Sequence, residues 1–264
     1  MRACDHELAF ARELAVAAGE VLLRHFGTRL DVRMKGWADP VTIADHEAEA
    51  LIERAIRRRY PADGMEGEEK GRRSGTSGRT WVVDPLDGTA NFAGGTPIFT
   101  VVLTLVDESR PNEALLNVTY DPVRQELFHA TRGGGAYLNG DPIRTSACED
   151  LARALVHVHF SNRRSEWRAS VELARRVSAV APHARNLGST ALAQAYVAAG
   201  RLHAHVKVRS GTYDVIGGNL LIAEAGGVVT DLDGRSWCPG SSLLAAGPQL
   251  HSRLLQVVAG LRRP

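Results

Sequence analysis

The chain has 264 residues, 44% of them hydrophobic, which is enough for one large domain or two closely packed halves. Its formal net charge is +2 and the basic residues are dispersed, so we expect no nucleic-acid partner. No apolar run approaches the length of a membrane span, and Asp5 and Glu7 stand where a signal peptide needs an apolar core. The three cysteines, Cys4, Cys148 and Cys238, lack metal-ligand or redox spacing. We therefore expect a cytoplasmic protein that binds no membrane.

The first residues of the chain alternate between helical and extended patterns. Apolar residues recur at helical spacing between Asp5, a candidate N-cap, and Gly27, which ends the pattern. Residues 31–43 are typical of extended or loop chain, and a second amphipathic helix follows until Pro61. A charged, flexible turn explains residues 65–79, which are rich in Glu, Gly, Ser and Arg.

A β-rich run that starts at Trp81 ends in the motif Asp84-Pro85-Leu86-Asp87-Gly88-Thr89. Two carboxylates at the end of one strand converge, and hard divalent cations prefer several oxygen ligands on such a rigid framework. Pro85 has a fixed φ that can turn the Leu86 carbonyl oxygen toward the same space. The N–H groups of Gly88 and Thr89 would then hold an anionic oxygen beside a metal. By itself, Asp-Pro-x-Asp-Gly is more typical of a surface turn.

The pattern then changes between two halves of the chain. Strands are predicted at 98–106, 114–120, 125–130 and 136–138, with hairpin turns at 132–135 and at Asn139-Gly140, as in an antiparallel meander. From residue 149 the prediction is a strand at 155–160, helices at 166–181 and 190–199, a strand at 203–208, a helix after Tyr213 and a strand at 228–232. We therefore expect an α/β protein with an α+β half at 1–148 and an α/β half at 149–264.

Two pairs of histidines lie in the predicted strands. His157 and His159, like His203 and His205, are two residues apart, which places both rings of a pair on one face of a strand. A zinc site is conceivable, but no acid or thiol at a fixed spacing accompanies the pairs. We favour packing or strand-edge histidines.

Five elements follow one another along the chain: Lys35 with Asp39-Pro40-Val41-Thr42 and Asp45; Gly67-Glu68-Glu69; Asp84 to Phe92; Arg185 to Ala191; and Tyr213 to Gly227. Together they resemble the inositol monophosphatase family, the lithium-sensitive, magnesium-dependent phosphomonoesterases. Single elements also have structural explanations, because Asp45 is favoured by a helix dipole and Asp214 is a good helix-start residue. All five in the family's order indicate membership.

The resemblance implies a layered αβαβα fold with the active site between the halves, and it implies a set of metal ligands. By position, Glu68, Asp84 and the Leu86 carbonyl would hold one Mg²⁺. Asp84, Asp87 and Asp214 would hold a second. Glu68 would also help to place a third, weakly held ion. The cofactor is therefore expected to be two to three Mg²⁺ ions.

The resemblance also implies catalytic and substrate-binding residues. Thr89, near Glu68 and Asp45, would orient the attacking water. The implied substrate-binding residues are Asp87, Gly88, Thr89, Gly188, Ser189, Thr190, Lys207 and Asp214. The family further implies a homodimer.

The expected partner is a small-molecule phosphate substrate whose identity these motifs leave open. An inositol phosphate or another sugar or cyclitol phosphate is the first expectation; histidinol phosphate, a sugar bisphosphate, a 3′-phosphoadenosine nucleotide and a specialised metabolite are alternatives. Lys207 stands where the inositol phosphatases carry a Glu that accepts hydrogen bonds from ring hydroxyls, and a lysine cannot accept them. It either faces the pocket and favours a second anionic group or points to solvent. A different class remains open as well, a catalytically silent phosphate-binding scaffold.

Overall fold

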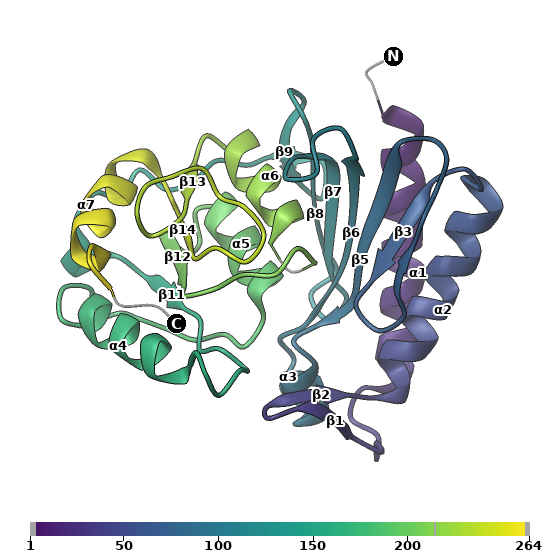
Figure 1. Ribbon diagram of the computed structural model, residues 1–264, viewed down its shortest axis with the longest axis horizontal. Helices are drawn as coiled ribbons and strands as arrows, with labels where there is room; N and C mark the ends of the chain where they lie inside the picture. Colours follow the sequence, from purple (N-terminus) through teal and green to yellow (C-terminus); the bar gives the residue numbers. More distant parts are fainter. Residues whose placement is uncertain (1–3, 214, 262–264) are drawn as a thin grey trace.

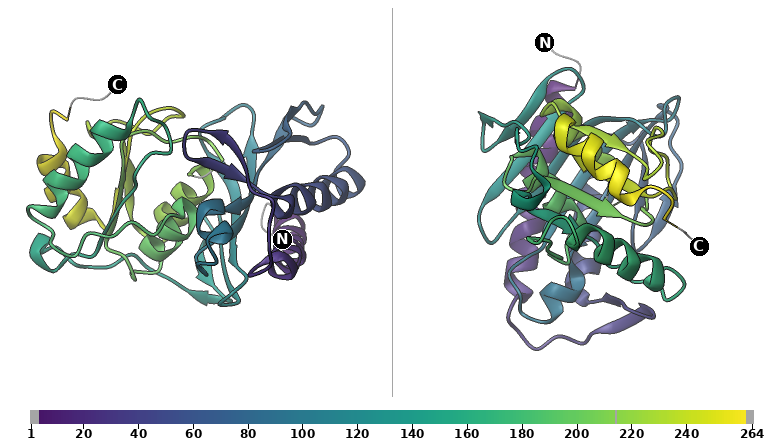
Figure 2. Two further views of the ribbon diagram at one scale, coloured as in Figure 1. Left: turned by 90° about the horizontal axis from the view of Figure 1, so that it is seen from below. Right: turned by 90° about the vertical axis from the view of Figure 1, so that its left-hand side faces the viewer.

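The computed structural model describes residues 4–213 and 215–261, in which helices and sheets alternate in five layers (Figure 1). Two helices, α1 (Asp5–His25) and α2 (Ile43–Arg59), cover one face of a large sheet, and α5 (Thr190–Ala198) and α6 (Ile216–Glu224) cover the other. A smaller sheet follows, with α4 (Trp167–Ser178) and α7 (Pro248–Val258) on its outer face. This order confirms the expected layered αβαβα fold. The α5–α6 layer also lies between the sheets when the molecule is seen from below (Figure 2).

The two outer helices of the first half lie where the sequence predicts them, but Asp5 is not the N-cap of α1: it is the first helical residue, Cys4 precedes it, and among the described residues no side chain caps this helix. Helix α1 buries one face that includes Ala11, Leu14 and Ala18. Helix α2 begins with a capping box, in which Thr42 accepts a hydrogen bond from the helix and Asp45 accepts one from Thr42 N–H. The segment expected as extended or loop chain forms the hairpin β1 (Arg33–Gly36) and β2 (Asp39–Val41) directly before α2.

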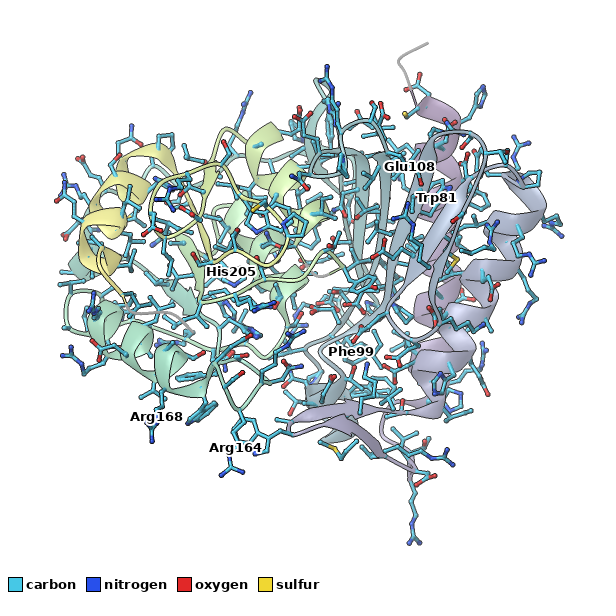
Figure 3. The ribbon with its side chains drawn as sticks, in the orientation of Figure 1. Trp81, Phe99, Glu108, Arg164, Arg168 and His205 are labelled. Atoms are coloured by element: carbon cyan, nitrogen blue, oxygen red, sulfur yellow. The ribbon has the colours of Figure 1, made fainter. Side chains whose placement is uncertain are left out.

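The large sheet has eight strands in the order β10-β9-β8-β7-β6-β5-β3-β4. Their bounds are β3 (Gly64–Gly67), β4 (Gly71–Arg73), β5 (Arg79–Asp87), β6 (Thr100–Asp107), β7 (Ala114–Asp121), β8 (Glu126–Thr131), β9 (Gly135–Leu138) and β10 (Asp141–Pro142). The predicted meander is confirmed as β6 to β9, with neighbouring strands antiparallel. Strand β5 is buried from Thr80 onward, and Trp81 within it donates to Asp63 over 3.1 Å (Figure 3).

The prediction of a flexible turn over residues 65–79 was wrong in part. Strand β3 lies parallel to β5, and β4 extends the sheet beyond it. Strand β3 has only four residues, two glycines and Glu66 among them, so it carries no local strand pattern and depends on pairing with β5 and β4. Gly67 fits because a Cβ atom there would meet the Glu49 carboxylate of α2.

The smaller sheet has four strands in the order β11-β12-β14-β13. They are β11 (Val156–Val158), β12 (Ala204–Lys207), β13 (Val228–Thr230) and β14 (Leu243–Ala246), and a short 3₁₀ turn at Leu151–Arg153 precedes β11. Strands β11 and β12 are parallel, so both run toward the same edge of the sheet. The sequence interpretation placed no element after residue 232 and therefore missed β14 and α7.

The core is shared between the two predicted halves of the chain. Among the described residues, one buried cluster belongs to the first half and another to the second. A third combines Phe128 and Ala130 with Leu192 and Leu221, and a fourth combines Val82 with Ile216. The boundary at 148/149 stays a prediction, and both sides of it contribute to one interior.

Candidate active site

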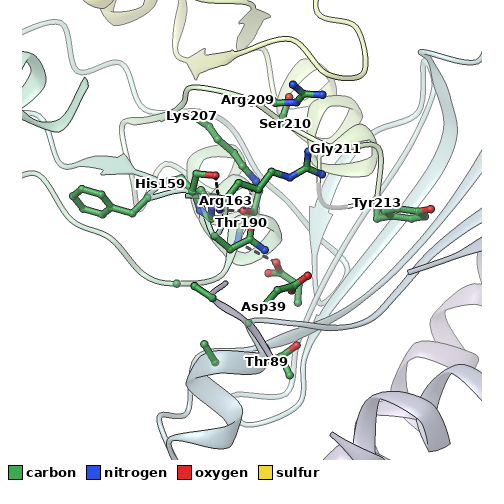
Figure 4. Close-up of a pocket in the computed structure, with 18 of the residues that line it drawn as sticks. Asp39, Thr89, His159, Arg163, Thr190, Lys207, Arg209, Ser210, Gly211 and Tyr213 are labelled. Carbon is green, nitrogen blue, oxygen red and sulfur yellow. Dashed lines mark hydrogen bonds between the residues drawn. The ribbon is translucent and has the colours of Figure 1, made fainter. Parts of the chain in front are cut away.

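A cavity of about 710 Å³ lies between the two halves of the molecule (Figure 4). Nine of the predicted site residues line it: Glu68, Asp84, Leu86, Asp87, Gly88, Thr89, Gly188, Thr190 and Lys207. Asp45 and Ser189 lie behind its wall, at 1% and 0% exposure. Asp214 lies outside the described residues. The structure therefore brings into one cavity residues that are far apart in the sequence.

The end of β5 forms the acidic wall of this cavity. Asp84 and Asp87 are buried, and the pairing of β5 with β6 shifts register between them. Asp84 Oδ1 accepts a hydrogen bond from Leu86 N–H at 3.0 Å, which fixes the turn through Pro85. The Leu86 carbonyl oxygen lies 2.9 Å from Thr89 Oγ1. The carbonyl oxygen thus accepts a hydrogen bond from the Thr89 hydroxyl, and its role as a metal ligand stays a prediction.

Thr89 connects the motif to α2. Its Oγ1 atom lies 3.1 Å from Asp45 Oδ1 and 2.9 Å from the Leu86 carbonyl oxygen. The other Asp45 oxygen accepts hydrogen bonds from Thr42 N–H at 2.8 Å and Thr42 Oγ1 at 2.7 Å. Burial raises the pKa of Asp45, against the lowering effect of these hydrogen bonds. One carboxylate therefore caps a helix and holds the Thr89 hydroxyl.

Glu68 lies opposite Asp84 at the end of β3. Burial raises the pKa of Glu68, while the charge of Lys35 and contact with Asp84 lower it. Lys35 Nζ lies 2.9 Å from Glu68 and 2.5 Å from Glu69. Burial lowers the pKa of Lys35, but the two neighbouring glutamates raise it by more. The pKa of the lysine therefore lies above its ordinary value. The β1–β2 hairpin thus supplies a cation to the acidic wall.

Asp87 joins the two halves. Its Oδ1 atom accepts Thr190 N–H at 3.1 Å, its Oδ2 atom accepts Ala191 N–H at 3.0 Å, and Ser189 Oγ donates to Oδ2 as well. These amides form the N-terminus of α5, where a carboxylate is favoured by the helix dipole. Gly88 follows with φ of 97°, and a Cβ atom there would lie 2.8 Å from the Ile98 carbonyl oxygen. Only glycine fits this close approach.

The residues present suit hard divalent cations. Glu68, Asp84, Asp87 and the Leu86 carbonyl offer oxygen ligands only. The partly exposed Glu68 contacts the buried Asp84, and two carboxylates in contact are unfavourable without positive charge. Within residues 4–213 and 215–261, no group of three or more Asp, Glu, His or Cys side chains is arranged so that these side chains alone could hold a metal ion. The predicted ligand set also needs a main-chain oxygen and Asp214.

The histidines take several roles. His157 and His205 face each other across β11 and β12, with ring centroids 4.5 Å apart, and both are fully buried. Burial, with a smaller effect of Lys207, lowers the pKa of His157 to about 3, so the ring is neutral. His159 lines the cavity, and His203 Nδ1 accepts Leu155 N–H at 2.9 Å.

Several lining residues were missed by sequence reasoning. Arg163 lies in the loop after β11, and Arg209 lies just beyond β12. Parallel strands carry their binding residues in the loops that follow their carboxyl ends. The sequence signal was therefore available once β11 and β12 were known to be parallel neighbours, which the sequence does not show.

An acidic cavity between the halves of an αβαβα fold defines the class of this protein. The sequence pattern of the inositol monophosphatase family matches residues 4–263, and the chain belongs to this family. The resemblance predicted from the five sequence elements is thereby confirmed.

Particular relatives are similar along most of the chain. "Nus factor SuhB" of Xylella fastidiosa is 40% identical over 83% of this chain and 80% of that protein. "Inositol-1-monophosphatase" of Mesorhizobium japonicum is 36% identical over 93% of each. The crystal structure of the extragenic suppressor protein SuhB from Bartonella henselae has a TM-score of 0.92 at 31% identity, covering 97% of this chain and 99% of that one.

Proposed function

We propose that the protein is a Mg²⁺-dependent phosphomonoesterase that hydrolyses a small phosphate ester, inositol-phosphate-like or another sugar or cyclitol phosphate. The observation that carries this proposal is the convergence of Glu68, Asp84 and Asp87 on one cavity with the Thr89 hydroxyl. Relatives named as inositol monophosphatases support it.

In this proposal Glu68, Asp84, the Leu86 carbonyl, Asp87 and Asp214 hold two to three Mg²⁺ ions. The ions would supply positive charge that lowers the pKa of the attacking water and neutralises the leaving oxygen. The Thr89 hydroxyl, held 3.1 Å from Asp45, orients that water. Gly88, Gly188 and Thr190 border the same space and bind the substrate with Lys207. Ser189 acts from behind them through Asp87.

The test is phosphate release by the variant Asp84→Asn. Replacing one charged ligand should lower kcat/KM at least about 100-fold, because the lost interaction stabilises the transition state by several kcal/mol. The exposed Asp31→Asn is the matched control and should keep full activity. Full activity of Asp84→Asn in a folded protein, or of the wild type in excess chelator, would rule the proposal out.

Other expectations of the family belong to the same proposal. We infer inhibition by lithium, a homodimer and a cytoplasmic location; three free cysteines support the last. Among the described residues, no helix is long and apolar enough to cross a membrane. Histidinol-phosphate, sugar-bisphosphate, 3′-phosphoadenosine and specialised-metabolite phosphatases remain alternatives for the substrate.

A second kind of function also stays open. Relatives carry the name Nus factor, and a catalytically silent phosphate-binding scaffold would keep the same fold. Every catalytic position that the structure describes, namely Asp45, Glu68, Asp84, Asp87 and Thr89, holds the residue that the chemistry needs. We therefore favour the enzyme.

A further inference from the structure

The cavity has a second wall whose charge is opposite to that of the first. Strands β11 and β12 are parallel, and the chain beyond their carboxyl ends brings Arg163 and Arg209 to the cavity. Lys207, the last residue of β12, lines the same wall at 7% exposure, and its Nζ atom lies 3.3 Å from Thr190 Oγ1. Figure 4 shows these three side chains on the side of the cavity that the second half forms.

A buried glutamate positions the two arginines. Glu166 Oε1 lies 3.6 Å from Arg209 Nε and 4.0 Å from Arg163 Nη1, and its side chain is 4% exposed. The other oxygen accepts a hydrogen bond from Ser161 Oγ at 2.6 Å. One carboxylate therefore serves two guanidinium groups, whose side chains are 65% and 49% exposed. Two guanidinium groups against one carboxylate leave this wall of the cavity positive.

The neighbouring histidines do not add to this charge. Burial, followed by the charges of Lys207 and His157, keeps the pKa of His159 well below its ordinary value. The positive charge of the wall thus belongs to permanently charged arginine side chains and to Lys207. On the opposite wall, Lys35 lies 2.9 Å from Glu68, so the nearest basic side chain to this glutamate comes from the first half and not from the arginine wall.

The two walls of the cavity would bind different parts of the substrate. The acidic wall, with its metal ions, receives the phosphate that is cleaved. A volume of about 710 Å³ leaves room for the alcohol half of a substrate beside it. Arginine forms paired hydrogen bonds with phosphate and carboxylate oxygens. We propose that the alcohol half of the substrate carries a second anionic group, phosphate or carboxylate, and that Arg163, Arg209 and Lys207 select it. This inference rests on the proposed phosphatase function.

Two matched pairs of substrates test the inference. Glycerol 2-phosphate and 2-phosphoglycerate differ by a carboxylate in place of a hydroxymethyl group. Fructose 1-phosphate and fructose 1,6-bisphosphate differ by a second phosphate. In at least one pair, kcat/KM for the more anionic member should exceed that of its partner about tenfold or more, mainly through KM. The pair that shows the preference identifies the second group as carboxylate or phosphate. The preference should also weaken as salt is added, because the guanidinium groups are partly exposed.

The variants Arg163→Gln and Arg209→Gln should reduce this preference without lowering kcat for glycerol 2-phosphate or fructose 1-phosphate, which lack the second anionic group. Arg164→Gln is the matched control, since Arg164 is exposed and points away from the molecule (Figure 3). Lys207→Met should also reduce the preference for the more anionic substrate. Because Lys207 is buried and its replacement could disturb folding, the test relies on the two exposed arginines. Equal use of both members of each pair by the wild type, or an unchanged preference in both arginine variants, would overturn the inference while leaving the phosphatase intact.

A binding measurement separates the two proposals. Calorimetry in excess chelator should show fructose 6-phosphate binding more tightly than fructose, and Arg163→Gln should remove the difference. If no phosphate ester is hydrolysed but this difference is present, the phosphatase proposal fails and the anionic subsite stands. If the difference is absent, a phosphate subsite is refuted whatever the hydrolysis assay shows, and a carboxylate subsite then requires the preference for 2-phosphoglycerate and its loss in the arginine variants.

Discussion

Single buried residues set how stability depends on pH, and His129 is the simplest case. It lies in β8, stacked against Tyr137 with ring centroids 5.2 Å apart, and is 7% exposed. Burial, with a smaller effect of Arg12, lowers the pKa of His129 to about 4 from 6.5. The unfolded chain therefore binds the proton first, and stability present above pH 6.5 is lost as the pH falls toward 4.

We expect His129 to contribute a loss of up to about 2 kcal/mol in the free energy of unfolding between pH 7 and pH 5. Urea titrations at both values measure it, and His129→Gln is the comparison because carboxylates and the other histidines titrate equally in both proteins. The variant should lose less stability than the wild type over this range. An identical loss would show that His129 binds its proton equally well in the native and the unfolded protein.

At the scale of elements, Gly217 decides how closely α6 packs on the large sheet. A Cβ atom at this position would lie 2.0 Å from Asn117 Oδ1 and 2.3 Å from Thr104 Oγ1. These two side chains are fully buried and hydrogen-bonded to each other at 3.0 Å, so neither can move away freely. Gly217→Ala should destabilise the protein by about 1–3 kcal/mol in urea unfolding, despite the better helix propensity of alanine.

Gly36→Ala is the control for this prediction, because a Cβ atom added there would lie 3.6 Å from its nearest neighbour, Asp39 Cβ, which is an ordinary contact. Its effect should stay within about 0.5 kcal/mol. If both variants unfold at the same urea concentration as the wild type, α6 has room to shift and the close packing is not required.

Elements with one strong local pattern were predictable, and elements defined by their neighbours were not. The meander β6 to β9 consists of β-branched and apolar runs separated by turn residues, so local sequence is sufficient. Strand β3 carries Glu66 and gains its identity from pairing with β5. Helix α7 has apolar residues at Leu250, Leu254 and Val258, a helical spacing that the interpretation overlooked.

The candidate site divides in the same way. The acidic residues belong to short motifs, so residues that are close in the sequence also lie close together in the structure. Arg163 and Arg209 have no motif, because their meeting depends on β11 and β12 being parallel neighbours although Val156 pairs with the distant Ala204. Of the two orientations expected for Lys207, toward the pocket or toward solvent, the structure shows the first.

At the scale of the whole molecule, we expect the two halves to unfold together. The shared clusters and the hydrogen bonds of Asp87 to α5 connect them. Trp81 reports on the first half and Trp237 on the mixed cluster. In variants that keep one of these as the sole tryptophan, with Phe elsewhere, fluorescence and far-ultraviolet circular dichroism should give the same urea midpoint. Separate midpoints would indicate two independently folding units.

The contact between Asp87 and the start of α5 has a consequence for how members of this family could change substrate. In the proposed phosphatase, the described acids that would hold the metal ions lie on the first half, and the strand ends that would contact the rest of the substrate lie on the second. The amides of Thr190 and Ala191 bind Asp87, so α5 holds the second half in a fixed position against the first. The loops beyond β11 and β12 could therefore change in sequence without moving the two halves apart. A hybrid that grafts only the loops beyond β11 and β12 from a relative should inherit that relative's choice of alcohol, whereas one that replaces the residues around Ser189 should lose the alignment on which hydrolysis depends.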